Sequence, residues 1–207
     1  MNEQATAQFW DEMYGRAGRV WSGNPNPVLT REATDLAPGS ALDAGCGEGA
    51  DSYWLARRGW RVHAVDISAV ALDRAASHDE PEIADRITWE RGDLTALVPR
   101  PKAYDLVNSQ FLHFPRAVRE PLFGRLADAV APGGTLLLVG HHPLDLDTTA
   151  SRPAEPDLYF TPEELVATLD PDSWDVLVAR ADPRGGKDRE GRELTLHDTV
   201  LRARRRT

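Results

Sequence analysis

A glycine-rich loop is the first part of the sequence that could do chemistry. The stretch LDAGCGEGA (42–50) places Gly45, Gly47 and Gly49 between an apolar run and a helical pattern. Glycine lets a backbone turn sharply and approach a ligand closely. Such a loop between a strand and a helix indicates a nucleotide site, and the alternative is a tight turn that binds no ligand.

An acidic residue at the end of the next apolar run supports the nucleotide site. Asp66 lies 21 residues after Gly45, and a carboxylate at about this spacing can accept hydrogen bonds from both hydroxyls of a ribose. Asp66 can also be interpreted as a helix cap, because it and Ser68 lie near a predicted helix start. We favour ribose binding because the strand end and the spacing agree.

The loop also contains charges that discriminate between ligands. Its glycines follow the pattern G-x-G-x-G, whereas the dinucleotide fingerprint is G-x-G-x-x-G. A pyrophosphate favours a helix N-terminus without negative charge, but this loop carries Asp43, Glu48 and Asp51. These acids favour a ligand with an ammonium group and a sulfonium.

The elements that must position these residues alternate along the chain. Alternating strands and helices predict parallel βαβ units in a three-layer αβα sandwich. The charged turn at 183–191 leaves no room for a helix, so the last two strands should form an antiparallel hairpin. The predicted strands are 40–44, 60–67, 86–93, 103–110, 135–142, 173–182 and 193–205, and the predicted helices are 3–15, 27–36, 48–59, 68–78, 116–130 (interrupted near Pro121) and 161–169.

Composition excludes several classes of protein. The 207 residues are 41% hydrophobic and carry a formal net charge of −9, which favours one folded domain and disfavours binding to nucleic acid or anionic lipid. Cys46 is the only cysteine, so no internal disulfide can form. The N-terminus is polar and no apolar run reaches about 18 residues, so we expect a cytoplasmic protein without a membrane span.

The stretch ALDAGCGEGADSYWLARRGWRVHAVDIS (41–68) resembles the class I S-adenosylmethionine-dependent methyltransferases. It is most similar to small bacterial methyltransferase-domain proteins related to the tellurite-resistance and thiopurine methyltransferases. RGD (91–93), YDLVNSQF (104–111) and APGGTLLLVG (131–140) follow in the family's order. The resemblance covers nearly the whole chain and implies a Rossmann-like, seven-stranded sheet of order 3-2-1-4-5-7-6 with strand 7 antiparallel. It specifies the fold and the cofactor, S-adenosyl-L-methionine, but not the substrate.

The resemblance also implies a set of cofactor-binding residues. Asp93 would accept a hydrogen bond from the adenine amino group, although its side chain could instead close a β-turn. Cys46 has no paired histidine in the sequence, so we interpret it as a small packing residue rather than a nucleophile. The implied residues are Asp43, Ala44, Gly45, Cys46 and Gly47 along the methionine half, Asp66, Ile67, Gly92, Asp93 and Leu94 at the ribose and adenine, and Ser109 and Gln110 facing the methyl-transfer space.

Histidines follow the fourth and fifth predicted strands, where a substrate would bind. His113 and His141 are the candidate catalytic residues, because imidazole titrates near neutrality; the alternative for each is a surface or helix-end position. His141 and His142 are adjacent, but neighbours on an extended chain point to opposite sides and no third ligand has suitable spacing. We therefore predict no metal site.

An aromatic segment, FWDEMYGRAGRVW (9–21), precedes the first predicted strand. In the thiopurine-type relatives the equivalent segment crosses over the bound cofactor. The resemblance implies that Trp10 and Tyr14 pack near the methionine end and that Trp21 borders the substrate space. The alternative is a helix that only covers the sheet with its apolar face.

This segment would form part of a lid. We expect one methyltransferase domain over 1–207, with a helical lid at 1–37 on a Rossmann-like core at 38–207. Gly15 and Gly18 would be its hinges, and Phe9 and Met13 would pack in either arrangement. Arg16 and Arg19 are candidates to meet a carboxylate of the cofactor or substrate.

These features predict methyl transfer to a small molecule, because no additional domain fits between the predicted elements. An acceptor that is soft and already ionised, such as a thiolate, a selenolate or a tellurite-derived anion, needs no general base, whereas a hydroxyl or amine needs one of the histidines. The alternatives are a nicotinamide-dependent oxidoreductase and a non-catalytic S-adenosylmethionine-binding protein. We expect a monomer or homodimer.

Overall fold

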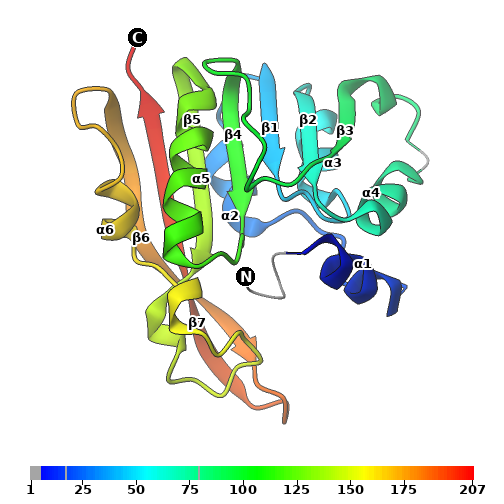
Figure 1. Ribbon diagram of the computed structural model, residues 1–207, viewed down its shortest axis with the longest axis vertical. Coiled ribbons are helices and arrows are strands. Elements are labelled where there is room, and N and C mark those ends of the chain that lie inside the picture. The colour runs from blue at the N-terminus through cyan, green and yellow to red at the C-terminus, as the bar shows by residue number, and fades with distance from the viewer. Residues whose placement is uncertain (1–5, 17, 79) are drawn as a thin grey trace.

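The computed structural model describes residues 6–16, 18–78 and 80–207, which form one seven-stranded sheet between helices (Figure 1). The strand order is β3-β2-β1-β4-β5-β7-β6, and β7 runs antiparallel to both neighbours. The predicted order and the predicted hairpin are both confirmed. The strands are β1 Ser40–Ala44, β2 Arg61–Asp66, β3 Ile87–Arg91, β4 Tyr104–Gln110, β5 Val130–His141, β6 Trp174–Lys187 and β7 Glu193–Arg205.

Helices cover both faces of the sheet. One core contains Leu29 of α2 and Leu55 of α3, and the other contains Leu122 of α5 and Leu165 of α6. Figure 1 shows α5 in front of the sheet and α2 behind it. The helices are α1 Ala7–Arg16, α2 Pro27–Ala33, α3 Ala50–Arg57, α4 Ala69–Ala76, α5 Arg116–Ala129 and α6 Pro162–Val166, and the 3-10 turns include η2 Ala84–Arg86, η3 Pro143–Asp145 and η4 Pro156–Leu158.

Several of these helices start at N-cap residues that can be recognised in the sequence. The side chain of Ser68 accepts a hydrogen bond from the Ala71 amide at the start of α4, and Thr161 and Glu164 form a capping box at α6. These contacts satisfy amides that have no partner within the helix. The predicted interruption at Pro121 is wrong, because α5 continues through it; a proline near the helix start removes only one intrahelical bond.

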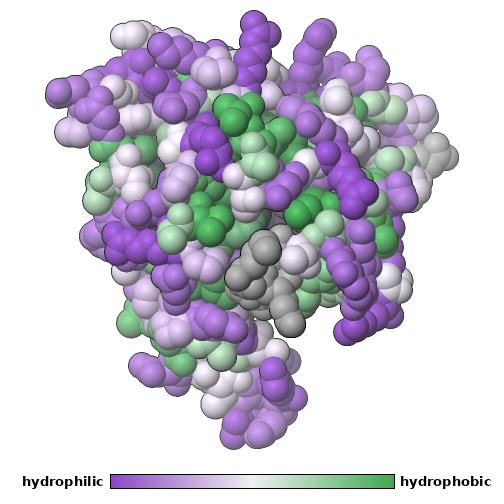
Figure 2. Space-filling model, viewed as in Figure 1, coloured by the Kyte–Doolittle hydropathy of each residue, from purple (hydrophilic) through white to green (hydrophobic). Residues whose placement is uncertain are grey.

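The final hairpin is longer than the sequence predicts. The stretch 183–187 was expected in a turn, but it pairs with β7 and extends β6 to Lys187. The turn shrinks because the Asp188 carboxylate accepts hydrogen bonds from the amides of Glu190 and Arg192, both at 2.9 Å. The hairpin therefore projects beyond the end of β5 (Figure 1), and its projecting end carries mainly hydrophilic side chains (Figure 2).

The N-terminal segment has two parts with different packing. In α2, Leu29 and Ala33 are fully buried, so this helix belongs to the packed layer. The other part, α1, lies across the carboxyl ends of the strands and docks on α4 through Asp11, which accepts hydrogen bonds from the Ser68 hydroxyl at 2.6 Å and the Val70 amide at 3.2 Å. The predicted first helix extends to residues 3–5, which lie outside the described residues.

Candidate active site

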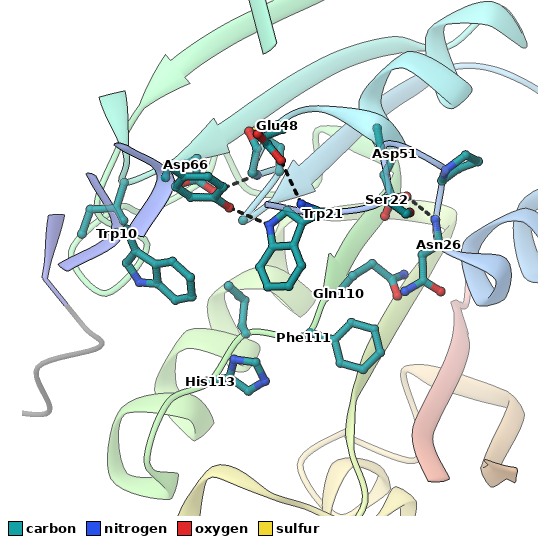
Figure 3. Close-up of a pocket in the computed structure, with 18 of the residues that line it drawn as sticks. Trp10, Trp21, Ser22, Asn26, Glu48, Asp51, Asp66, Gln110, Phe111 and His113 are labelled. Carbon is teal, nitrogen blue, oxygen red and sulfur yellow. Dashed lines mark hydrogen bonds between the residues drawn. The ribbon is translucent and has the colours of Figure 1, made fainter. Parts of the chain in front are cut away.

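A cavity of about 560 Å³ opens at the carboxyl ends of the strands, beneath the aromatic N-terminal segment (Figure 3). Ligand pockets have volumes of about 300–1,000 Å³, so this cavity has room for a bound ligand. Its wall is formed by the glycine loop and the start of α3 (45–51), the ends of β2, β3, β4 and β5, and part of β6. The predicted site residues that line it are Trp10, Tyr14, Trp21, Gly45, Cys46, Gly47, Asp66, Ile67, Asp93, Leu94, Gln110, His113 and His141.

Four predicted site residues, Asp43, Ala44, Gly92 and Ser109, do not line the cavity. Ala44 and Ser109 are buried and face each other across β1 and β4, so that pairing keeps them inside the sheet. The Gly92 amide donates to the Asp66 carbonyl at 2.9 Å and is a turn residue next to the site.

Asp43 is a structural acid beneath the glycine loop. Its carboxylate accepts hydrogen bonds from the Ser52 hydroxyl at 2.6 Å and the Asn108 side-chain amide at 2.9 Å. Burial raises the pKa of Asp43 to about 6. The expected contact of Asp43 with the cofactor is not present in this structure, because Asp43 does not line the cavity and both of its oxygens bind side chains of α3 and β4.

The glycine loop forms a wall of the cavity that admits no side chain. Gly45 and Gly47 have positive φ angles of 80° and 53°. A Cβ atom on Gly45 would lie 2.6 Å from the Leu112 side chain, and one on Gly47 would lie 2.9 Å from the Tyr14 hydroxyl. The loop is therefore both a tight turn and a ligand-facing surface, as a backbone that closely approaches a nucleotide requires.

The carboxylate of Asp66 fixes this loop and faces the cavity. One oxygen accepts a hydrogen bond from the Gly47 amide at 2.8 Å and the other from the Ser68 amide at 2.9 Å. The helix-cap interpretation is thus partly right, although Ser68 supplies the cap of α4. Burial raises the pKa of Asp66. Each oxygen keeps a second lone pair, so the carboxylate can still accept from ribose hydroxyls.

Glu48 anchors the N-terminal segment to the glycine loop. Its carboxylate accepts a hydrogen bond from the backbone amide of Trp21 at 3.1 Å (Figure 3). It also accepts one from the Val20 amide at 3.1 Å and pairs with Arg74 at 3.1 Å. The sequence interpretation assigned the loop acids jointly to a cationic ligand. Glu48 instead joins the glycine loop to the chain that crosses above it, so a smaller part of the loop charge is available to a ligand.

Asp51 is a site residue that the predicted set omits. It lines the cavity, and its Oδ1 accepts a hydrogen bond from the Asn26 amide at 2.6 Å. Burial, together with the nearby charge of Asp43, raises the pKa of Asp51 to about 7. The acidic loop was the available sequence signal, but the sequence does not show which acid turns toward the cavity.

Gln110 presents a free acceptor near Asp51. Its side-chain nitrogen donates to Asn108 Oδ1 at 2.6 Å, which orients the amide. Its Oε1 is buried and has no hydrogen-bond partner among the described residues. Figure 3 shows Gln110, Asn26 and Asp51 on one side of the cavity. Two acceptors on this side, one of them an acid, fit an ammonium group.

Aromatic rings and imidazoles line another part of the cavity. Phe111 directly follows β4 and has a φ of 56°, which is strained for a bulky residue. The His141 ring lies 4.9 Å from the Phe111 ring and 4.6 Å from the His113 ring, measured between centroids. Arg152 Nη1 lies 2.7 Å from His141 Nε2.

His113 is held as a neutral imidazole. Burial, with a smaller effect from the Arg152 charge, lowers its pKa to about 4. Its Nε2 is buried without a hydrogen-bond partner in the described chain. At neutral pH this nitrogen is available to a ligand but is a weak base.

Trp10, Tyr14 and Trp21 lie together beside the glycine loop. The Trp21 indole nitrogen donates to the Tyr14 hydroxyl at 2.9 Å, and the Trp10 and Tyr14 ring centroids are 6.2 Å apart. Tyr14 is buried, which raises its pKa, whereas Trp21 is 53% exposed. Of the expected hinges, Gly15 lies within α1.

Among the described residues, the arginine that lines the cavity is Arg184, whereas the sequence predicts Arg16 and Arg19. Arg16 pairs with Glu12 on the exposed face of α1 at 3.3 Å, and Arg19 contacts His78 at 3.2 Å. Neither lines the cavity, so their expected contact with a ligand carboxylate is not present in this structure. Arg184 of β6 lines it instead, from a stretch that the sequence predicts as a turn.

Comparison with known proteins identifies the family of this fold. Residues 41–134 match the family model of the methyltransferase domain. An uncharacterized methyltransferase of Mycobacterium tuberculosis is 36% identical over 123 residues, which cover 58% of this chain and 59% of that protein. The chain spans less than two thirds of the length of the curated relatives it matches.

Solved structures agree on the fold. One, from work on the conversion of a disulfide bond into a thioacetal group during echinomycin biosynthesis, has a TM-score of 0.74 and 22% identity and covers 97% of this chain and 92% of its own. TehB from Haemophilus influenzae has a TM-score of 0.71 and 19% identity and covers 96% of this chain and 66% of its own.

Residues 41–134 belong to the methyltransferase-domain family, and the strand order together with these similarities supports a class I S-adenosylmethionine-dependent methyltransferase with S-adenosylmethionine as its cofactor. These findings bear out the predicted methyltransferase and its cofactor. The alternative of a nicotinamide-dependent oxidoreductase is thereby set aside. Among the described residues, no helix is long and apolar enough to cross a membrane, and no group of three His, Cys, Asp or Glu residues is arranged to hold a metal ion.

Proposed function

We propose that the protein transfers a methyl group from S-adenosylmethionine to a small-molecule acceptor. The observation that carries this proposal is one continuous cavity whose acidic, glycine-walled part adjoins an aromatic part (Figure 3). The first part suits the cofactor, and the second leaves space for an acceptor beside it. The second part has mainly aromatic lining, with Arg184 as its cation among the described residues. This lining favours a small organic molecule over nucleic acid, which needs an extended basic surface.

The residues of the acidic part fit the cofactor. Gly45 and Gly47 present bare backbone to the cavity, and Gln110 Oε1 is a buried acceptor without a partner in the described chain. Asp66 would accept from the ribose hydroxyls, and Asp51 and Gln110 would accept from the ammonium group. Ile67, Asp93 and Leu94 would surround the adenine, with Asp93 also closing its turn through a 2.8 Å hydrogen bond from the Thr95 amide.

When bound, the cofactor supplies an electrophilic methyl group on a positively charged sulfur. The residues of this chain then act mainly by position. A lone pair on the acceptor forms the new bond to the methyl carbon, the electrons of the broken carbon–sulfur bond remain on sulfur, and any acceptor proton passes to water. Trp10 and Trp21 would exclude water and place aromatic faces near the cation, contributing about 0.5–2 kcal/mol per contact.

The state of His113 favours an acceptor that is already ionised. A pKa of about 4 makes this imidazole a poor general base at neutral pH. The second candidate base is His141. Its Nε2 already has a partner, because the Arg152 guanidinium lies 2.7 Å from it. We therefore propose a soft anion such as a thiolate as the nucleophile, with selenium and tellurium anions as further candidates.

A turnover screen tests the proposed function. The protein is incubated with S-adenosylmethionine and thiols, selenite, tellurite, halides, phenols or amines, and S-adenosylhomocysteine is measured. We expect turnover with a thiol whose pH dependence follows the thiol's own ionisation, and a change of less than about tenfold in His113→Asn. Cofactor binding without turnover in any class would support the non-catalytic alternative, and turnover with amines alone, lost in His113→Asn, would overturn the soft-anion proposal.

A further inference from the structure

The sign of the charge changes across the cavity. The acids in its wall, Glu48, Asp51, Asp66 and Asp93, lie on the glycine loop, on the first turn of α3, at the end of β2 and just after β3. Arg184 is the cation that lines it among the described residues, and it lies on β6. Strand β6 is the edge strand opposite β3, so Arg184 enters the cavity from the edge of the sheet that is remote from Asp66 and Asp93.

Ring-bearing side chains line the wall between Arg184 and the acids at the ends of β2 and β3. Phe111, His113 and His141 come from the ends of β4 and β5, which lie between β2 and β6 in the strand order. The His141 ring centroid is 4.9 Å from that of Phe111 and 4.6 Å from that of His113. The imidazole of His113 is neutral because burial lowers its pKa to about 4. Aromatic faces of this kind bind planar, unsaturated groups.

The guanidinium of Arg184 is oriented but not fully used. Its Nε donates to Asp198 Oδ2 at 2.7 Å, and it makes no other hydrogen bond within the described chain. A guanidinium has five N–H donors, so most of them remain for a ligand. Asp198 is buried and also lies 3.8 Å from Arg152 Nη2, so its charge is shared between two arginines.

Resting on the proposed function, we propose that the acceptor is a small planar molecule with an anionic group, such as a carboxylate, which Arg184 binds. The planar body lies along Phe111, His113 and His141, and the nucleophile is at the end that faces the cofactor. A hydrogen bond between an ionised donor and acceptor is about twice as strong as a neutral one. An acceptor with a positive group at this end would be repelled by Arg184.

The test compares two probes of equal shape. Benzoate and benzamide are titrated by calorimetry into the full-length protein saturated with S-adenosylhomocysteine. The variants are Arg184→Met, Arg184→Lys and Arg180→Met. Arg180 is a matched control on the same strand, because its side chain is 47% exposed against 44% for Arg184, and it pairs with Glu32 and Asp182 outside the cavity.

We expect the wild type to bind benzoate at least about tenfold more tightly than benzamide, since hydrogen bonds to charged groups contribute about 1.5–3 kcal/mol. Arg184→Met should lose this preference, and Arg184→Lys and Arg180→Met should keep it. Equal binding of both probes by the wild type, binding of neither, or a preference that survives in Arg184→Met would overturn the inference.

Binding of S-adenosylhomocysteine separates this inference from the proposed function. If the wild type does not bind S-adenosylhomocysteine, the proposed function fails. If it binds but shows no preference for benzoate, only the acceptor class is wrong. Unchanged S-adenosylhomocysteine affinity in Arg184→Met shows that the variant is folded, and Arg184→Lys provides a second folded variant that keeps Asp198 paired.

Discussion

The two parts of the cavity are built in different ways. The proposed cofactor part consists of backbone turns and acids that lie close in sequence, such as Asp66 holding the amides of Gly47 and Ser68. The proposed acceptor part consists of side chains from distant strands, where His141 meets Arg152 and Arg184 meets Asp198. The comparison indicates that a fixed backbone geometry serves the common cofactor, while replaceable side chains determine the acceptor.

Removing the carboxylate of Asp66 should have the largest effect, and it tests whether the backbone turns and acids form the cofactor part of the cavity. We expect Asp66→Ala to weaken S-adenosylmethionine binding by about 30–100-fold, because hydrogen bonds to a charged group contribute about 1.5–3 kcal/mol. Calorimetric titration measures this. Asp105→Ala is the control, since Asp105 accepts from the Ser40 amide at 2.8 Å at the opposite end of β1. Unchanged affinity in Asp66→Ala would contradict the ribose assignment.

The pH dependence of binding sharpens the role of Asp51. Its pKa of about 7 means that the carboxylate is increasingly ionised above neutrality, and an ammonium group binds the ionised form. We expect affinity for S-adenosylmethionine to rise by about tenfold between about pH 6 and 8, since one proton is released on binding. Asp51→Asn should flatten this dependence, and a slope that persists in that variant would assign it to another group.

The folding stability of the free protein should depend on pH in the opposite direction to its affinity for S-adenosylmethionine. Because the folded pKa of Asp51 is raised above its usual value of 3.8, the folded state binds more protons between pH 3.8 and about 7. The stability of the wild type relative to Asp51→Asn should therefore decrease as pH rises through this window. Thermal unfolding of both proteins across the window measures the difference.

Truncating the lid tests whether it belongs to the site. Trp21 is 53% exposed, so Trp21→Ala should leave the thermal midpoint unchanged. We expect it to weaken cofactor or acceptor binding by about 5–10-fold, because one aromatic face contributes about 0.5–2 kcal/mol. Trp54→Ala is a suitable control, since Trp54 packs beside Arg58 at 4.9 Å, away from the cavity. Equal binding by wild type and Trp21→Ala would favour simple packing over a lid.

The smallest expected effect isolates one lid contact. Tyr14→Phe removes the hydroxyl that accepts the Trp21 hydrogen bond. We expect binding to weaken by about two- to fivefold, because a neutral hydrogen bond contributes about 0.5–1.5 kcal/mol. In a double-mutant cycle, Tyr14→Phe should add little to Trp21→Ala. Full additivity would show that the two side chains act separately.

Much of the fold could be predicted from local patterns. The alternation of elements, the caps at Ser68 and Thr161 and the final hairpin are all confirmed. The continuous α5 and the long hairpin were not predicted, because packing keeps Pro121 in the helix and because the Asp188 side chain closes a shorter turn. Both depend on contacts that a local pattern does not contain.

The candidate site divides in the same way. Local sequence identified the loop glycines, whose positive φ angles require glycine, and placed Asp66 at a strand end beside them. It could not show that Asp43 turns inward to Ser52 and Asn108 while Asp51 turns toward the cavity. Asp43 and Asp51 lie close together in the sequence, and only the packing of helices on the sheet decides which of them is enclosed and which faces the cavity.

The sequence by itself determined the layered fold and the place of the glycine loop, because these depend on periodicity, turn chemistry and short spacings, and its resemblance to known methyltransferases indicated the family. Tertiary structure alone decided that Glu48 fastens the N-terminal segment, that His113 is kept neutral, and that Arg184 reaches the cavity from β6. These outcomes depend on burial and on contacts between segments far apart in the chain. Their energies arise only when the sheet brings those segments to one edge.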